Sequence, residues 1–115
     1  MQVRREVLGD AHVDRTIKAT TPLTEAFQDL ITRYAWGDVW GRPGLDRRTR
    51  SAITVAMLVA LGRPEELAMH LRGAITNGLT REEIAEILLQ TAVYCGVPAA
   101  NHAFRVAGDV LNAEG

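Results

Sequence analysis

The stretch from Arg63 to Gly78 places the strongest constraint on the fold, because it is a helix with both of its ends marked. Pro64 suits the first helical position, where its missing N–H costs no hydrogen bond. Gly78 can adopt the left-handed backbone conformation that closes a helix. Between these ends, apolar residues recur at helical intervals and predict one buried face, formed by Leu67, Leu71, Ala74 and Ile75.

Helix signals of this kind recur along the chain, and no stretch alternates with period two over a useful length. Residues 1–20 read as one or two short helices split near Gly9, and we expect their few apolar residues to dock on something else, such as a neighbouring subunit. The other expected helices run from about 22 to 35, 47 to 61, 80 to 95 and 97 to 112, besides the one already described. We therefore predict an all-α, six-helix bundle that forms a single domain over residues 1–115.

A loop is predicted from Trp36 to Leu45, because this segment contains three glycines and one proline. It also contains both tryptophans of the chain, which on a loop would form an anchoring plug or the wall of a pocket. From Ala52 onward the next helix is apolar on nearly every side, which is typical of a central, buried helix. The helix before the loop carries its own apolar stripe: Leu23, Phe27, Leu30, Ile31 and Tyr34.

Composition argues against several classes of function. The chain carries 13 basic and 14 acidic residues, a net charge of −1, so nothing attracts it to nucleic acid or to an acidic membrane surface. No apolar run is long enough to span a bilayer, and the polar N-terminus predicts no signal peptide, so we expect a cytoplasmic protein. The one cysteine, Cys95, cannot form an internal disulfide, and a four-cysteine zinc site is impossible.

The sharpest candidate for chemistry is the pair Glu66 and His70, which are four residues apart on one helix and about 6 Å apart along its axis. A carboxylate beside an imidazole can raise the imidazole pKa and fix its orientation, which suits general acid catalysis near neutral pH. The same spacing also describes an ordinary surface pair. A metal pair would need a third ligand, and none shares the spacing.

A basic cluster surrounds the start of the helix at residue 47, and it consists of Arg42, Arg47, Arg48 and Arg50. Guanidinium groups and unpaired helix N–H groups meet there, which predicts an anion site. A solvated, internally paired turn or a set of subunit contacts would explain the same arginines. Cys95 and His102 form a weaker pair, for which a buried thiol on an apolar face is the simpler interpretation.

Five segments taken together resemble the 4-carboxymuconolactone decarboxylase family, within the alkylhydroperoxidase-D-like superfamily. The similarity runs in one register from about Arg5 to Leu111, and it is carried by Trp36–Trp40, Arg42–Arg50, Leu61–His70, Asn77–Glu86 and Tyr94–His102. The resemblance implies an all-α fold that assembles with itself into a homotrimer or homohexamer. An apolar central helix and a sparse N-terminal segment also suggest that other subunits complete the burial.

Peroxidase members of the superfamily carry a glutamate, then a Cys-x-x-Cys motif, then a histidine after three further residues. In register with His70, the two cysteines fall on Arg63 and Glu66, and the glutamate falls on Ser51. A dithiol mechanism needs two thiols within reach of each other. The resemblance therefore points to the decarboxylase branch.

That branch implies decarboxylation of 4-carboxymuconolactone, a lactone dicarboxylate, to 3-oxoadipate enol-lactone in the β-ketoadipate pathway of protocatechuate degradation. No cofactor and no metal are implied, because the conjugated lactone carbonyl of the substrate accepts the electron pair. The hypothesis makes His70 the general acid, poised by Glu66. Contacts to carboxylates or the oxyanion, or a place in the pocket wall, fall to Arg42, Arg50, Ser51, Trp36, Trp40, Cys95, Asn101 and His102.

Two other interpretations are open at the level of the sequence. One is an enzyme of the same fold that acts on a different lactone or keto acid. The other is a non-catalytic oligomeric binding or stress protein, which would show no decarboxylation and a pocket too small for a dicarboxylate.

Overall fold

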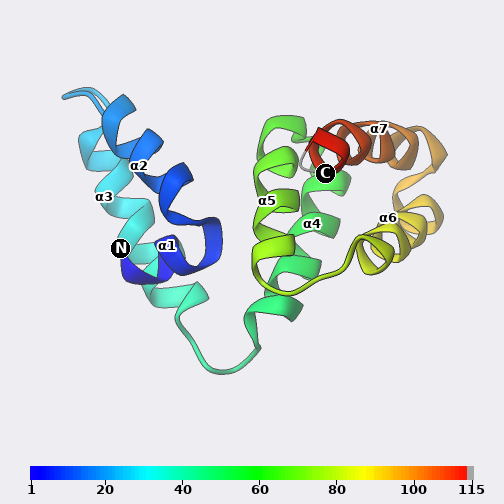
Figure 1. Ribbon diagram of the computed structural model, residues 1–115, viewed down its shortest axis with the longest axis horizontal. Helices are drawn as coiled ribbons and strands as arrows, with labels where there is room; N and C mark the ends of the chain where they lie inside the picture. The colour runs from blue at the N-terminus through cyan, green and yellow to red at the C-terminus, as the bar shows by residue number, and fades with distance from the viewer. Residues whose placement is uncertain (114–115) are drawn as a thin grey trace. The chain divides into compact units, whose positions relative to one another are not determined.

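The computed structural model describes residues 1–113, and within that range the chain is entirely helical, without a strand. The all-α prediction is confirmed. The described residues hold seven α-helices and one π-helix, more than the six helices expected. The chain forms two compact units, Met1–Arg47 and the residues from Arg48 onward, and Figure 1 shows the helices of each. The single domain over residues 1–115 stays a prediction.

The first unit contains α1 (Gln2–Leu8), α2 (Asp10–Ala19), α3 (Glu25–Ile31) and the π-helix η1 (Thr32–Trp40). Helices α1 and α2 separate at Gly9, whose φ of +90° favours glycine. Val7 and Val13 are fully buried inside this unit. The expectation that the N-terminal apolar residues dock elsewhere is therefore wrong for these two residues, because they form the core of their own unit.

The loop predicted from Trp36 to Leu45 is wrong over its first half. Residues 32–40 continue the helix with the wider π geometry, and only the residues after Trp40 form a turn before the next helix. Trp36 and Trp40 lie one turn apart and are both buried, with ring centroids 5.4 Å apart. Burial of two indole rings outweighs the helix cost of Gly37, which is on the order of 1 kcal/mol.

The apolar stripe from Leu23 to Tyr34, which runs through α3 into η1, has the predicted helical period, but most of its side chains are exposed. Helix α3 contains no buried residue, and Leu23, Phe27 and Tyr34 are 91%, 59% and 63% exposed.

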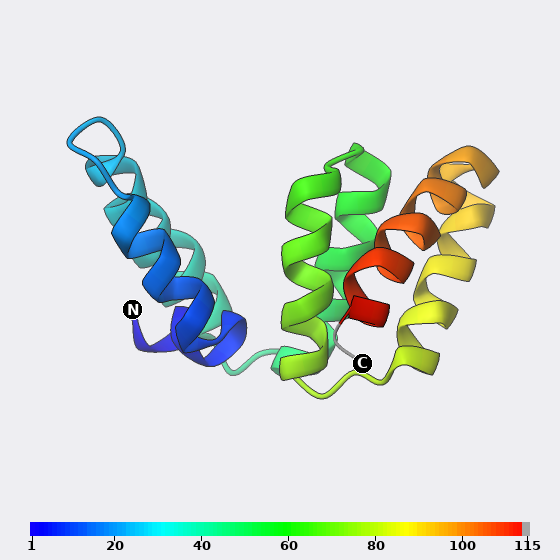
Figure 2. The ribbon, with the colours of Figure 1, turned by 45° about the horizontal axis from the view of Figure 1, so that its top comes forward.

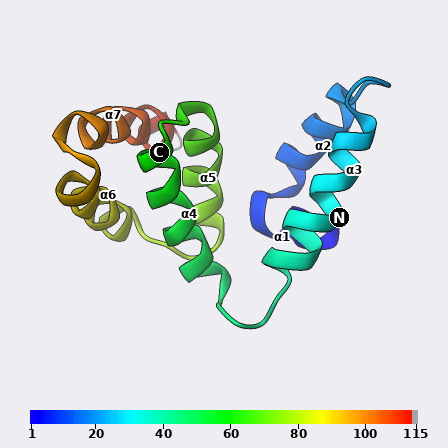
Figure 3. The ribbon, with the colours of Figure 1, turned by 180° about the vertical axis from the view of Figure 1, so that it is seen from behind.

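The second unit contains α4 (Arg47–Leu61), whose first residue belongs to the first unit, and then α5 (Pro64–Thr76), α6 (Arg81–Cys95) and α7 (Val97–Ala113). Figure 2 shows α4 beside α5, and α6 beside α7. Figure 3 shows the same pairs from behind. All four helices contribute to one core, and its largest fully buried side chains are Leu67, Leu71, Ile84 and Leu88. Burial of each such side chain contributes roughly 1.5–3 kcal/mol.

The connection between α5 and α6 is fixed by polar contacts. Helix α5 ends before Gly78, whose φ is +101°, and Thr80 and Glu83 form a reciprocal capping box at the start of α6. Arg48 of α4 donates to the carbonyl of Gly78 at 3.3 Å and forms an ion pair with Glu83. This holds the start of α4 beside the end of α5, which positions the site described below.

The sequence predicts that α4 is a central helix, buried on nearly every side. This prediction is wrong, because one face of α4 is exposed. Val55 and Val59 lie in the core, whereas Ile53, Met57 and Leu61 are 42%, 51% and 65% exposed. A helix at the side of a four-helix unit can bury only one face, so the other apolar face stays on the surface. No helix of the described residues is long and apolar enough to cross a membrane.

Candidate active site

His70 lies on α5 and is 9% exposed. The stripe of Leu67, Leu71 and Ala74 beside it is buried as predicted, but Ile75 is 36% exposed. The stripe turns α5 toward the core and carries the histidine in with it. His70 is therefore a buried histidine and not a solvated surface residue.

Glu66 lies one turn before His70 on α5, and its side chain is exposed. It forms no hydrogen bond or ion pair with any of residues 1–113. A spacing of four residues on a helix brings two side chains onto neighbouring positions. The pair is thus adjacent by backbone geometry.

Ser51 lies in the first turns of α4 and is 1% exposed. Its Oγ accepts a hydrogen bond of 3.0 Å from Nδ2 of Asn77, the residue that ends α5. Asn77, Gly73 and His70 follow one another at intervals of four and three residues, so they share one face of the helix. Ser51 is therefore hydrogen-bonded to Asn77, and Asn77 lies on the same face of α5 as the buried His70.

The two candidate arginines lie in different parts of the chain. Arg50 is half-buried on α4, directly before Ser51. Arg42 is exposed in the turn after η1 and belongs to the first unit, as do Trp36 and Trp40. The tryptophans stack on each other at an interplanar angle of 35° and are buried within that unit.

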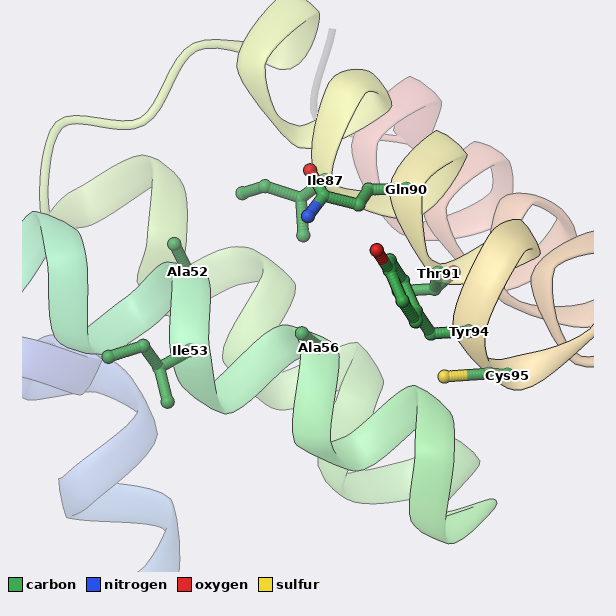
Figure 4. Close-up of a pocket in the computed structure, with 8 residues that line it drawn as sticks. All are labelled: Ala52, Ile53, Ala56, Ile87, Gln90, Thr91, Tyr94 and Cys95. Atoms are coloured by element: carbon green, nitrogen blue, oxygen red, sulfur yellow. The ribbon is translucent and has the colours of Figure 1, made fainter.

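A pocket of about 330 Å³ lies between α4 and α6, and Figure 4 shows the side chains that surround it. Cys95 is half-buried at one end of it, next to Thr91 and Tyr94. The wall is mainly apolar and contains no arginine and no histidine. Of the predicted site residues, only Cys95 lines this pocket, so it is separate from the cluster around His70.

Asn101 and His102 lie on α7 and are exposed. The inward face of that helix consists of small residues, among them Ala100, Ala103 and Ala107. These alanines allow close packing against the other helices and turn the two polar side chains outward. Among residues 1–113, no group of three or more His, Cys, Asp or Glu side chains is arranged to hold a metal ion.

The fold and the buried histidine define an all-helical protein with a polar site at the junction of two helices, α4 and α5. Residues 25–109 match the model of the carboxymuconolactone decarboxylase family, and the chain belongs to this family. The resemblance seen in the sequence is thereby confirmed.

Two curated relatives match almost the whole chain. A 4-carboxymuconolactone decarboxylase of Acinetobacter baylyi is 48% identical over 96% of this chain and 83% of its own. A nitrosuccinic acid decarboxylase of Metarhizium robertsii is 45% identical over 97% of this chain and 78% of its own. A 4-carboxymuconolactone decarboxylase of Pseudomonas putida is 58% identical over 33% of this chain and 79% of its own.

The sequence alone assigned no role to two polar residues, Asn77 and Arg4. Asn77 shares the helix face of His70, and this spacing was its only signal. Arg4 is 6% exposed, although it is charged. It precedes Val7 and Leu8 by three and four residues, so a cation occupies the buried face of α1, and that placement could have drawn attention to it.

Proposed function

We propose that this protein decarboxylates 4-carboxymuconolactone to the enol-lactone of 3-oxoadipate. The observation that carries the proposal is the 48% identity, over 96% of the chain, with a relative that bears this name. The buried His70 on α5 supports it, because a proton donor shielded from water is what the reaction needs.

The reaction needs no electron acceptor other than its substrate. The bond from the ring carbon to its carboxylate breaks, and its electron pair moves through the ring C=C bond into the lactone carbonyl. Carbon dioxide leaves, and a furanolate anion remains. A proton added to the carbon next to the carbonyl gives the enol-lactone and restores the carbonyl.

The protein has three tasks in this scheme, which are to hold two carboxylates, to stabilise an oxyanion and to deliver one proton. His70 delivers the proton, and Glu66, one turn away on α5, orients the imidazole. Arg50 binds a carboxylate or the oxyanion through its guanidinium fork. Ser51 donates one further hydrogen bond.

A second candidate substrate is nitrosuccinic acid, because the relative with that name is 45% identical over 97% of the chain. Its nitro group sits on the carbon that bears a carboxylate, and it would take up the electron pair as a nitronate. Both compounds are dicarboxylates with a built-in electron acceptor. The same proton donor and the same anion contacts would serve either reaction.

The test uses the purified protein with each compound in turn, in the presence of a chelator. Loss of the ultraviolet absorbance of 4-carboxymuconolactone, with release of one carbon dioxide, is the expected result. Turnover of nitrosuccinate at a much higher kcat/KM would replace the first substrate by the second. Absence of turnover with both would support a non-catalytic binding protein or a different acid as substrate.

We further propose that the protein works as a homotrimer or homohexamer. Large apolar side chains remain on the surface of α6, where Leu89, Val93 and Tyr94 are 57%, 75% and 83% exposed. The stripe of α3 and the outer face of α4 are exposed as well. Contact between copies of the chain would remove these surfaces from water. Each Å² of apolar surface buried in this way stabilises the assembly by roughly 25 cal/mol.

A further inference from the structure

Arg4 of α1 is a buried cation without a counter-ion. Its side chain is 6% exposed, and no carboxylate among residues 1–113 forms an ion pair with it. One hydrogen bond is present, from Nη1 to the hydroxyl of Thr32 at 3.1 Å. Burial lowers the pKa of the guanidinium. A buried charge is normally paired, so this arrangement calls for an explanation.

The same place contains two unsatisfied polar atoms. Nε of Arg4 and Oε1 of Gln28 are both buried without a hydrogen-bond partner among the described residues. Both residues line a cavity of about 410 Å³ that lies wholly within the first unit. Thr16, Thr20 and Thr32 contribute hydroxyl groups to its wall. An unpaired buried donor beside a cavity, here Nε–H of Arg4, indicates an acceptor group that is bound there.

We propose that this cavity binds a carboxylate, with one oxygen on Nε–H of Arg4. A guanidinium accepts carboxylates preferentially, because its N–H groups match the two oxygens. Glu25 and Asp29 also line the cavity and carry negative charge. They repel ligands of higher charge, so the site prefers a small monocarboxylate, such as acetate or propionate, to phosphate or a dicarboxylate.

This site is separate from the proposed decarboxylation, since every residue in it belongs to the first unit and none of them is assigned to the reaction. Its carboxylate has two possible sources, a small free acid or a Glu or Asp side chain of a second copy of the chain. The chemistry at Arg4 is the same in both cases. Binding of acetate and the state of assembly are therefore measured together.

The first experiment is calorimetric titration of the purified protein with sodium acetate in a low-chloride buffer. We expect saturable binding with a Kd of about 1–10 mM, as a few charge-assisted hydrogen bonds give a small ligand. Arg4→Gln should raise this Kd at least about tenfold. Arg15→Gln, which removes an exposed arginine of α2, should leave it unchanged. Phosphate should bind more weakly than acetate.

The second experiment separates binding from structural support. Arg4→Met keeps an unbranched apolar side chain, shorter than that of arginine, and removes the buried charge. In anion-free buffer its urea midpoint should equal or exceed that of the natural protein, because an unpaired buried cation is replaced by an apolar group. Both tryptophans lie in the same unit as Arg4, so their fluorescence reports its unfolding. Acetate should raise the midpoint of the natural protein and leave that of Arg4→Met unchanged.

Two results would overturn the proposal, and a third would decide between its two sources. One is a natural protein without saturable acetate binding whose assembly is unchanged by Arg4→Gln, which would leave water as the occupant. Another is a clear loss of stability in Arg4→Met, which would make Arg4 a structural residue. The third is a smaller assembly in Arg4→Gln, by analytical ultracentrifugation, together with no acetate binding in the natural protein. That combination would assign the carboxylate to a neighbouring copy.

Discussion

Asn77 holds Ser51 by a hydrogen bond of 3.0 Å from Nδ2 to Oγ, and so joins the end of α5 to the start of α4. Ser51 is 1% exposed, and its side chain has no other hydrogen bond among residues 1–113. Because its oxygen accepts from the amide, its own proton is left to donate. We therefore propose that Asn77 is a positioning residue that makes Ser51 a donor in the proposed reaction.

Asn77→Asp tests this direction with almost no change of shape. A carboxylate at residue 77 can only accept, so it would take the proton of Ser51 away from the substrate. We expect kcat/KM to fall by at least about tenfold, most of it in kcat, with the circular dichroism spectrum retained.

The control for Asn77→Asp is the same change in a Ser51→Ala protein. If Asn77 acts through the hydroxyl, the second substitution should add little once Ser51 is gone. An equal loss in both backgrounds would instead show that the added charge acts directly on the anionic substrate. An active Asn77→Asp protein would contradict the positioning role.

His70→Gln removes the proposed proton donor and keeps an amide of similar size. We expect kcat to fall by about 10²–10⁴-fold with a small change in KM, since general acid catalysis contributes in this range. His12→Gln, in the first unit, is the matched histidine control and should keep full turnover. A folded His70→Gln protein that retains most of its turnover would exclude His70 as the acid.

Arg50→Ala should act on binding. Loss of one guanidinium–carboxylate contact should raise KM by about 10–100-fold, while kcat changes less. Arg105→Ala is the comparison, because Arg105 is an exposed arginine of α7 that has no part in the proposal. Steady-state kinetics on both variants decide the matter, and unchanged constants for Arg50→Ala would remove Arg50 from the site.

Val93→Glu tests the proposed assembly. Val93 is 75% exposed on α6, so a glutamate there is harmless in a single chain but would be buried in an interface. Sedimentation should show a smaller particle than for the natural protein. Glu86→Gln, on the same helix, should leave the particle size unchanged. A Val93→Glu protein of unchanged mass would place the interface elsewhere.

Glu6→Gln tests how the start of α4 is tied to α1. Arg47 donates a hydrogen bond of 2.6 Å to Glu6, and this bond lowers the pKa of the carboxyl below its ordinary 4.5. A lowered folded-state pKa adds stability at pH values above 4.5, and the gain disappears as the pH falls through the lowered value. The natural protein should therefore unfold at a higher temperature than Glu6→Gln near neutral pH.

The outcome expected at acidic pH makes the Glu6 test specific. Thermal unfolding followed by tryptophan fluorescence should give converging midpoints as the pH falls below 4.5, because Glu6 becomes protonated and loses its advantage over glutamine. A gap that persists unchanged in acid would assign the effect to packing or to the neutral hydrogen bond.

The helices of the second unit could be read from local signals. Helix α4 runs from Arg47 to Leu61 as predicted, and α5 starts at Pro64 and stops before Gly78. Proline at a first turn and glycine with a positive φ act through the backbone of a few neighbouring residues. Such signals do not depend on the rest of the chain, and so they survive folding.

The helix through Trp36 and Trp40 could not be read in this way. Its glycines predicted a loop, but burial of both indole rings extends the helix as η1. The apolar stripe that runs through α3 has the predicted helical period, but α3 contains no buried residue. A period shows which residues share a face of a helix, and it does not show whether another element covers that face.

The sequence by itself determined the family, the all-helical class and the residue types of the candidate site, because these depend on local pattern and residue identity. Only the tertiary structure decided which polar groups are taken out of water. It buried His70 and Ser51, set Asn77 against Ser51 and enclosed Arg4 without a counter-ion. Burial arises from residues distant in the chain, and no local signal reports it.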